Sequence, residues 1–238
     1  MSDNTTATRE KMTRNAAQQQ AILEEACLLF IEKGFGGTNI QDIADAAGLT
    51  RTAVYHYFPS KEAMLVALTE DVTQKASELA ASVSLRDDVP AEEALQQLII
   101  QHAGLILSQP LQFRVVERSE SNLPEAHRAA AQEARRGVLD HFTHVIQRGI
   151  REGSFRPIAA HVAAFSIIGM CNWCAWWFDA SGEVSAREVA DMIAELGLRG
   201  LLTAKPSGSR PVSIGDTLNQ MRDAMAVLER QVSHLSSR

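Results

Sequence analysis

The chain has 238 residues, 45% of them hydrophobic and 22% charged, which is the composition of a globular protein that can bury a sizeable core. No run of about 18 apolar residues could span a bilayer, the N-terminal residues lack the apolar stretch of a signal peptide, and three cysteines do not make the disulfide framework of a secreted domain. We therefore expect a cytoplasmic protein without a membrane partner, and the net charge of −6 on its own argues against a nucleic-acid partner.

Two elements are predicted before the first glycine. Residues 1–14 are polar and show no hydrophobic periodicity, so they are predicted to be a disordered arm. A solvated tail is favoured over a minor-groove contact through its basic residues. From about Asn15 to Lys33, apolar residues recur on one face at helical spacing, which predicts a first helix. Gly34 is expected to end that helix, because glycine readily adopts the left-handed conformation found after helix ends.

Two short helices joined by a tight turn are predicted between Thr38 and Lys61. Thr38 is expected to cap the first helix with its hydroxyl, and Gly48 supplies the turn. The second helix spans 51–57, buries Val54, and points outward the residues that can reach phosphates and base edges of DNA: Arg51, Thr52, Tyr55 and His56. Because no acidic residue lies between Gly48 and Lys61, this stretch is locally basic in an acidic chain, and it is predicted to be a helix-turn-helix motif.

This stretch resembles the DNA-binding domain of TetR/AcrR-type bacterial transcriptional regulators. The matching segments are Ile43-Ala44, Ala47-Gly48-Leu49-Thr50, Val54-Tyr55-His56-Tyr57-Phe58 and Lys61-Glu62. Thr52 departs from the pattern, since a glycine or small residue is common there, and this departure bears on which bases are read. We expect phosphate contacts from Thr38, Tyr55 and Lys61, and base contacts from Arg51, Thr52 and His56. The full set of expected DNA-binding residues is Thr38, Thr50, Arg51, Thr52, Tyr55, His56 and Lys61.

The rest of the chain up to about residue 202 is predicted to be helical, which makes the fold all-α. The expected helices span about 63–84, 91–108, 111–121, 125–151, 158–178 and 185–202. Residues 145–157 again resemble the TetR-type pattern. In TetR-type proteins, the last two core helices usually pair across a two-fold axis as a four-helix bundle. The final helix has an apolar stripe suited to that use, formed by Val189, Met192, Ile193, Leu196, Leu198 and Leu201. We therefore expect a homodimer.

The expected organisation is a three-helix head on a helical body, followed by a tail. The domains are a disordered arm (1–14), a helix-turn-helix DNA-binding domain (15–61), a ligand-binding and dimerisation domain (62–204), a linker (205–211) and a C-terminal amphipathic helix (212–238). In the last of these, apolar residues from Ile214 to Leu235 alternate steps of four and three, which is a heptad seam. We expect the tail to dock on its own dimer, with the joining of chains as the alternative.

An apolar effector pocket is expected among the four helices between residues 91 and 178, whose inward side chains offer few polar groups. Arg114 and Arg118 lie one turn apart and could bind an acidic head group, although solvated arginines are favoured. The expected ligand-binding residues are Leu98, His102, Leu105, Phe113, Arg114, Arg118, Phe142, Phe165, Trp173 and Trp177.

All three tryptophans fall within residues 173–177, so part of this cluster must face either a dimer partner or a ligand cavity. The segment Gly169-Met170-Cys171-Asn172-Trp173, followed by Trp177, resembles more weakly the C-terminal domain of TetR-type repressors of fatty-acid and steroid catabolism that respond to CoA thioesters. That resemblance implies an acyl-CoA-like effector, and plain dimer packing is an equal alternative.

Other residue patterns argue against different functions. Cys171 and Cys174 have the spacing of a redox or metal pair, but core packing is favoured on such an apolar helix. His141 and His144 lie one turn apart without a third ligand nearby in sequence, so neither a metal nor a cofactor is expected. The chain contains no nucleophile-elbow, Walker or zinc-protease motif, which argues against an enzyme.

The sequence therefore favours a ligand-responsive transcriptional repressor that binds a palindromic operator as a homodimer. The alternative is a small-molecule-binding helical protein, or an enzyme, without sequence-specific DNA binding.

Overall fold

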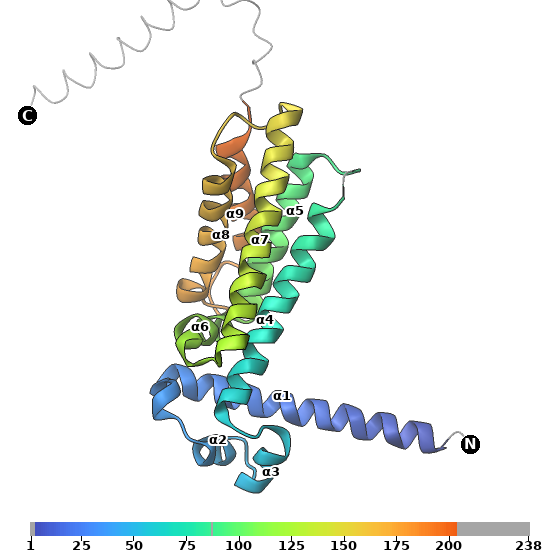
Figure 1. Cartoon of the computed structure of the whole chain (residues 1–238), viewed down its shortest axis with the longest axis vertical. Helices are drawn as coiled ribbons and strands as arrows, with labels where there is room; N and C mark the ends of the chain where they lie inside the picture. Colours follow the sequence, from blue (N-terminus) through green and yellow to red (C-terminus); the bar gives the residue numbers. More distant parts are fainter. Residues whose placement is uncertain (1–2, 87, 204–238) are drawn as a thin grey trace, which may run out of the picture. The chain divides into compact units, whose positions relative to one another are not determined.

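The structure is a computed structural model that describes residues 3–86 and 88–203, with side chains from residue 15 onward. Its α-helices are α1 (Asp3–Gly37), α2 (Ile40–Ala46), α3 (Arg51–Tyr57), α4 (Lys61–Ser84), α5 (Ala91–Ser108), α6 (Pro110–Ser119), α7 (Glu125–Glu152), α8 (Ala160–Trp177) and α9 (Ala186–Leu201) (Figure 1). The predicted all-α fold is confirmed. In the described part of the chain, no helix is both long and apolar enough to cross a membrane. The predicted linker (205–211) and C-terminal helix (212–238) lie outside the described residues.

The first helix is longer than predicted. α1 begins at Asp3, so the backbone of residues 3–14 is helical and is not the disordered arm that the sequence suggested. This stretch is polar and therefore lacks the hydrophobic periodicity from which a helix is predicted. It nevertheless contains several strong helix formers and neither glycine nor proline. Because extending an existing helix is easier than starting one, the turns that begin near Asn15 can continue toward the N-terminus.

Local backbone signals set the short helices that follow. Gly34 interrupts α1 with φ 74° and ψ 162°, and Gly48 turns the chain between α2 and α3 with φ 66°. The N-cap of α2 is Asn39 and not Thr38 as predicted. Asn39 accepts a hydrogen bond from the Asp42 N–H at 3.0 Å, and the Asp42 carboxylate accepts one from the Asn39 N–H at 3.2 Å. This capping box fixes the start of α2 without the Thr38 hydroxyl.

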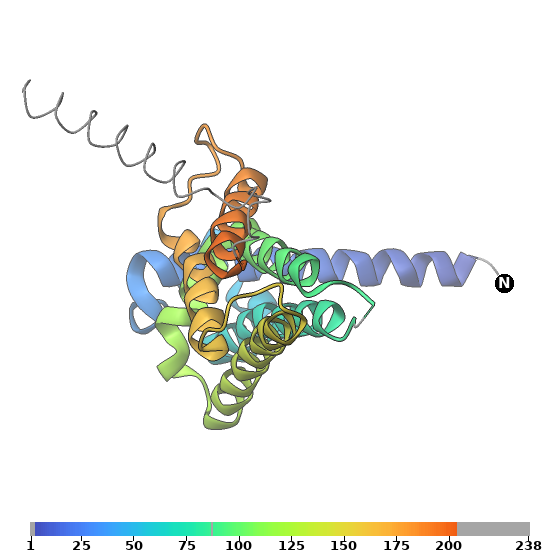
Figure 2. The same ribbon diagram turned by 90° about the horizontal axis from the view of Figure 1, so that it is seen from above.

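The described residues except the last form one compact unit that contains two hydrophobic clusters. The head cluster gathers apolar side chains of α1, α2, α3 and the first part of α4, among them the fully buried Ile43, Val54 and Met64. α6 also contributes to the head cluster, through Val115 and Val116. The body cluster is built by α4, α5, α7, α8 and α9, which run side by side (Figures 1 and 2).

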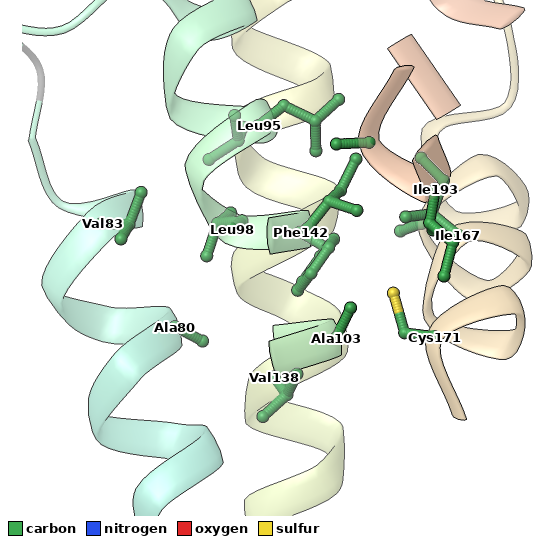
Figure 3. Packing of buried hydrophobic residues seen from close by; sticks show 14 of the residues in the cluster. Ala80, Val83, Leu95, Leu98, Ala103, Val138, Phe142, Ile167, Cys171 and Ile193 are labelled. Carbon is green, nitrogen blue, oxygen red and sulfur yellow. The ribbon is translucent and has the colours of Figure 1, made fainter. Parts of the chain in front are cut away.

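Phe142 of α7 lies in the middle of the body cluster. In Figure 3 it lies between Leu98 of α5 and the isoleucines Ile167 of α8 and Ile193 of α9. Phe142 and Leu98 are both fully buried. These side chains therefore pack against one another in the core of the bundle.

The apolar stripe predicted on α9 divides between two environments. Four of its six residues, Val189, Ile193, Leu198 and Leu201, are buried in the body cluster, so this part of the stripe serves the core of its own chain. The other two, Met192 and Leu196, are 58% and 60% exposed. The neighbouring helix α8 adds further exposed apolar side chains: Val162, Phe165, Met170, Trp173 and Trp177.

Candidate nucleic-acid interface and ligand cavity

The outer face of α3 is the candidate nucleic-acid interface. Thr50 caps this helix by accepting a hydrogen bond from the Ala53 N–H at 3.2 Å, and Val54 anchors it in the head cluster. The opposite face carries four of the predicted DNA contacts, all of them exposed: Arg51, Thr52, Tyr55 and His56. Because the chain from Gly48 to Lys61 contains no carboxylate, this face presents hydrogen-bond donors to phosphate without local repulsion.

Contacts within the head hold these side chains in place. Arg51 Nη2 donates to the Tyr55 hydroxyl at 3.0 Å, and the guanidinium lies 5.4 Å from the centre of the tyrosine ring. His56 packs edge-on against Tyr57, whose hydroxyl donates to Asn15 Oδ1 of α1 at 3.3 Å. Side chains that are already ordered lose less conformational entropy on binding, so the face is prepared for a partner.

Thr38 does not lie on this face. Its side chain is 2% exposed, and its hydroxyl lies within hydrogen-bond distance of the carbonyl oxygens of Leu29 (3.1 Å) and Gly34 (2.9 Å). The hydroxyl therefore binds the start of α2 to the end of the first helix. This geometry contradicts the predicted phosphate contact from the Thr38 side chain, because its only donor is used inside the head.

Lys61 is also engaged inside the head. Its Nζ donates to the carbonyl oxygens of Phe35 at 2.8 Å and Thr38 at 3.0 Å, and it lies 4.6 Å from the centre of the Phe35 ring. Two of its three N–H groups thus join the start of α4 to the end of α1 and to Thr38. A phosphate contact from Lys61 has only the remaining N–H to rely on, and the structural role is the one that these distances support.

A cavity of about 390 Å³ lies among α4, α5, α6, α7 and α8. Four of these helices were predicted to enclose an effector pocket, and α4 was missed. Its apolar contributions, Val72 and Ala76, come from a helix that was not among those predicted to enclose the pocket. Three of the predicted ligand-binding residues line the cavity: His102, Phe113 and Phe165.

His102 and Asn172 form a polar pair on the cavity wall. His102 is 6% exposed, its Nε2 lies 3.3 Å from Asn172 Oδ1, and its ring packs edge-on against Phe142. Burial, partly offset by the hydrogen bond with Asn172, lowers the pKa of His102 to about 4, so the ring is neutral near pH 7. Thr73 also lines the cavity, but its hydroxyl donates to the carbonyl oxygen of Thr69 at 2.8 Å.

Charged side chains of α6 and α7 complete the cavity wall. Arg135 lies 3.2 Å from Glu117 and 2.6 Å from Glu120, which joins the two helices. Arg136 pairs with Glu133 at 2.9 Å, and its side chain is 66% exposed. Both arginines were missed because they belong to a polar stretch of α7, where a pair of neighbouring arginines was the only available signal.

Several predicted ligand-binding residues do not line the cavity. Leu98 and Phe142 are fully buried in the body cluster, and Leu105 is partly buried against it. Arg118 is exposed, whereas Arg114 is partly buried, with an Nε that has no hydrogen-bond partner among the residues that the structure describes. The prediction placed these side chains by helical periodicity, which separates inside from outside but cannot distinguish packed core from cavity wall.

The tryptophan cluster faces mainly outward. Trp173 and Trp177, for which a ligand contact was predicted, are 62% and 53% exposed, and neither lines this cavity. Trp176 is partly buried and meets Phe113 edge-on at 6.0 Å between ring centres. It also stacks on Trp173 at 5.9 Å.

The cysteine and histidine pairs singled out in the sequence lie in different surroundings. Cys171 and Cys174 are buried in the body cluster, which confirms core packing, and burial raises the pKa of the Cys171 thiol to about 12. His141 Nδ1 lies 2.6 Å from Ser84 Oγ, and His144 is exposed. Within residues 3–86 and 88–203, no group of three or more His, Cys, Asp or Glu side chains is placed to hold a metal ion.

Two protein families match this chain. Residues 22–68 match the bacterial regulatory proteins of the tetR family, and this match spans α2 and α3. Residues 88–201 match the tetracyclin repressor-like C-terminal domain, and this match spans α5 to α9.

Individual relatives cover most of the chain. The HTH-type transcriptional repressor KstR2 of Rhodococcus jostii is 27% identical over 192 residues, which cover 78% of this chain and 92% of that repressor. The crystal structure of the TetR family regulator PfmR from Thermus thermophilus has a TM-score of 0.68 and 30% identity, covering 75% of this chain and 97% of PfmR. AibR, solved in complex with isovaleryl coenzyme A and operator DNA, has a TM-score of 0.64 and 25% identity over the same shares.

These relatives are transcriptional regulators and not enzymes. On the two family matches and the likeness to PfmR, this chain belongs to the TetR family of bacterial transcriptional regulators.

Proposed function

We propose that the protein is a ligand-responsive repressor that binds a palindromic operator as a homodimer in the bacterial cytoplasm. The observation that carries this proposal is the exposed face of α3, which is free of carboxylates and holds Arg51 against Tyr55. In two-fold helix-turn-helix dimers, the recognition helices enter successive major grooves roughly 34–36 Å apart. The α3 helices of the two protomers are proposed to do the same.

The homodimer is proposed to form through α8 and α9. Trp173 and Trp177 on α8, with Met192 and Leu196 on α9, are all more than half exposed, which is unusual for large apolar side chains on a free surface. Burying one such side chain contributes roughly 1.5–3 kcal/mol. Met192 and Leu196, which belong to the α9 stripe that was predicted to dimerise, thus remain available for a partner, and Trp173 and Trp177 add exposed apolar surface on α8.

An acyl-CoA thioester is proposed as the effector. The apolar wall of the cavity suits an acyl chain, and Arg135 and Arg136 supply cationic groups that can pair with the phosphates of CoA. The solved complex of AibR contains isovaleryl coenzyme A, and AibR shares 25% identity with this chain. This similarity supports the class of the effector and leaves the acyl group open.

Release from DNA is proposed to pass through α6. Phe113 and Val116 of this helix both line the cavity, and Val116 also belongs to the head cluster. Gln112 Nε2 donates to the Leu68 carbonyl oxygen at 3.0 Å and to Asp71 Oδ2 at 3.1 Å, so α6 is bound to α4 as well. An effector that prefers a different position of α6 would shift the population toward a head spacing that does not fit the operator.

The DNA interface is tested by gel shifts against the region upstream of the protein's own gene. Arg51→Ala and Tyr55→Ala should each weaken binding by about tenfold to a hundredfold, because α3 contacts of this kind contribute roughly 1–3 kcal/mol. Arg151→Ala is the matched control, since Arg151 is an exposed arginine in the last turn of α7. If the two α3 variants bound as tightly as the Arg151 variant, the assignment of the interface would be wrong.

The effector class is tested by fluorescence anisotropy of the protein bound to that DNA. Addition of acyl-CoA thioesters of increasing chain length should lower the apparent affinity, while the matching free acids act only at much higher concentration. If the free acids or unrelated aromatic compounds released the DNA and the CoA thioesters did not, the proposed class of effector would be wrong.

A further inference from the structure

The wall of the cavity contains an ion-pair network that joins α6 to α7. The Nη1 atom of Arg135 on α7 lies 3.2 Å from Oε1 of Glu117 on α6. Its Nη2 atom lies 2.6 Å from Oε2 of Glu120, the residue that follows α6. Gln132, one turn before Arg135, also donates to Glu120, at 3.0 Å. Since Arg135 and Glu117 both line the cavity, a single guanidinium holds the end of α6 against α7 at the cavity wall.

This network contains more negative than positive charge. Glu117 and Glu120 share Arg135, and in the part of the chain that the structure describes neither carboxylate has a second cationic partner. Side chains three residues apart on a helix are neighbours, so the two carboxylates would repel each other if Arg135 moved away. Arg136 differs, because its ion pair with Glu133 lies within α7 and connects it to no other helix.

The two ion pairs can be exchanged for others. The side chains of Arg135, Glu117 and Glu120 are 34%, 35% and 26% exposed, and ion pairs that water can reach contribute little to stability. A phosphate group carries more than one negative charge and three strong acceptor oxygens, and a guanidinium can bind it through two parallel hydrogen bonds. Such a group can therefore compete with the two carboxylates for Arg135.

We propose that the anionic end of the effector displaces Glu117 and Glu120 from Arg135, and that this exchange of ion pairs releases α6. When the protein binds DNA, the two carboxylates hold Arg135. When the effector is bound, its anion holds Arg135, and the two carboxylates repel both each other and the anion. The inference rests on the proposed function, because it takes this cavity as the effector site, and it names Arg135 as the residue that converts the charge of the ligand into a movement of α6.

The exchange makes the coupling between effector and operator depend on the two carboxylates. A ligand that binds both states of the protein equally shifts no population. In the double variant Glu117→Gln with Glu120→Gln, Arg135 is free in both states. A charged ligand should therefore bind the double variant more tightly and release its operator less. Long-range repulsion by the carboxylates alone would predict the tighter binding without the loss of coupling.

The test measures ligand affinity by calorimetry and operator release by fluorescence anisotropy on the full-length protein. The probes are decanoyl-CoA, which carries phosphates, decanoic acid, which carries a carboxylate, and the uncharged decanoyl-pantetheine. At saturation, decanoyl-CoA should weaken operator binding by the parent at least about tenfold more than decanoyl-pantetheine does. The double variant should bind decanoyl-CoA at least about fivefold more tightly than the parent and should lose most of that effect on the operator.

Two further variants complete the test. Glu133→Gln is the matched control, since it removes a carboxylate that pairs with Arg136 within α7, and it should leave operator release by decanoyl-CoA unchanged. Glu120→Gln alone removes the shorter of the two ion pairs and should give a smaller change in the same direction as the double variant. The test therefore does not depend on the folding of the double variant, and thermal melting shows which variants are folded.

The outcomes separate this proposal from the proposed function. If decanoyl-CoA did not bind, while decanoic acid released the operator from the parent and much less from the double variant, the exchange would stand and the CoA class would fall. If decanoyl-CoA released the operator equally from both proteins, or if decanoyl-pantetheine released it as well as decanoyl-CoA, the exchange would be wrong and the CoA class would stand. A failure of all three probes to bind would contradict both.

Discussion

The head and the body of this protein carry their functional side chains in different places, on an outer surface in the head and around a cavity in the body. The functional groups of the head stand on the outer face of α3, a helix of seven residues that a single buried valine anchors. The functional groups of the body line a cavity bordered by five helices. Substitutions on the surface of the head should therefore change binding and leave folding intact, whereas substitutions in the body divide sharply between core and cavity wall.

The largest expected effect separates the core of the body from its cavity. Phe142→Ala should lower the free energy of unfolding by about 3–5 kcal/mol, because it leaves a void among close-packed side chains. Phe165→Ala is the matched control, since Phe165 is 67% exposed and lines the cavity, so it should cost little stability and weaken effector binding. Chemical denaturation and effector titration of both variants make the comparison. Equal losses of stability would mean that core and wall have been assigned incorrectly.

The next effect concerns the buried histidine of the body. The pKa of His102 is lowered to about 4 by burial, so below pH 6.5 the unfolded chain binds a proton that the folded chain does not. Stability contributed by this residue is therefore lost as the pH falls from about 7 toward 4, by about 3 kcal/mol. Denaturation of the parent and of His102→Phe across this range should show a steeper decline for the parent. Parallel declines would show that His102 is solvated.

In the head, Lys61 distinguishes a structural contact from a DNA contact. Lys61→Met should lower stability by about 2 kcal/mol, because it removes charge-assisted hydrogen bonds to the carbonyl oxygens of Phe35 and Thr38. Lys33→Met is the control, since Lys33 makes only an exposed ion pair with Asp42 at 3.6 Å. If Lys61 mainly held a phosphate, its removal would instead leave stability unchanged and reduce the salt dependence of DNA binding by about one unit of slope.

The smallest expected effect compares the same local motif in both regions. Asn39 and Asp42 form a capping box at the start of α2, and Ser185 and Glu188 form one at the start of α9. Asn39→Ala and Ser185→Ala should each lower stability by about 1 kcal/mol. Only Asn39→Ala should also weaken operator binding, because α2 supports α3. Melting and gel shifts of the pair test this, and equal effects on DNA binding would remove the distinction between the regions.

The head could largely be predicted from the sequence because its determinants are local. Gly48 and Val54 each act within a few residues of their position in the chain, and each has the predicted role. The Thr38 hydroxyl and the Lys61 ammonium bind backbone carbonyl oxygens at the end of α1 and at Thr38, and these oxygens compete for the donors that had been assigned to DNA. Such competition does not appear in any sequence pattern.

The body was harder to predict because its site is made by packing. The boundaries of its helices followed from periodicity, and α5 spans the predicted residues. Which inward side chain meets a cavity depends on how neighbouring helices approach, so Phe142 was misplaced and Arg135 was missed. Asn172 lies within the Cys171 to Cys174 segment that the sequence singled out. Its hydrogen bond with His102 could not be predicted, because His102 lies 70 residues earlier in the chain.

The most direct measurement is a selection of the full-length protein against random double-stranded DNA. We expect a single enriched inverted repeat whose half-site centres lie about 10 base pairs, one helical turn, or a multiple of that, apart. Arg51→Ala should lose the enrichment, and Arg151→Ala should retain it. An unenriched pool from the parent protein, or the same motif returned by Arg51→Ala, would contradict the assignment of α3 as the recognition helix of an operator-binding dimer.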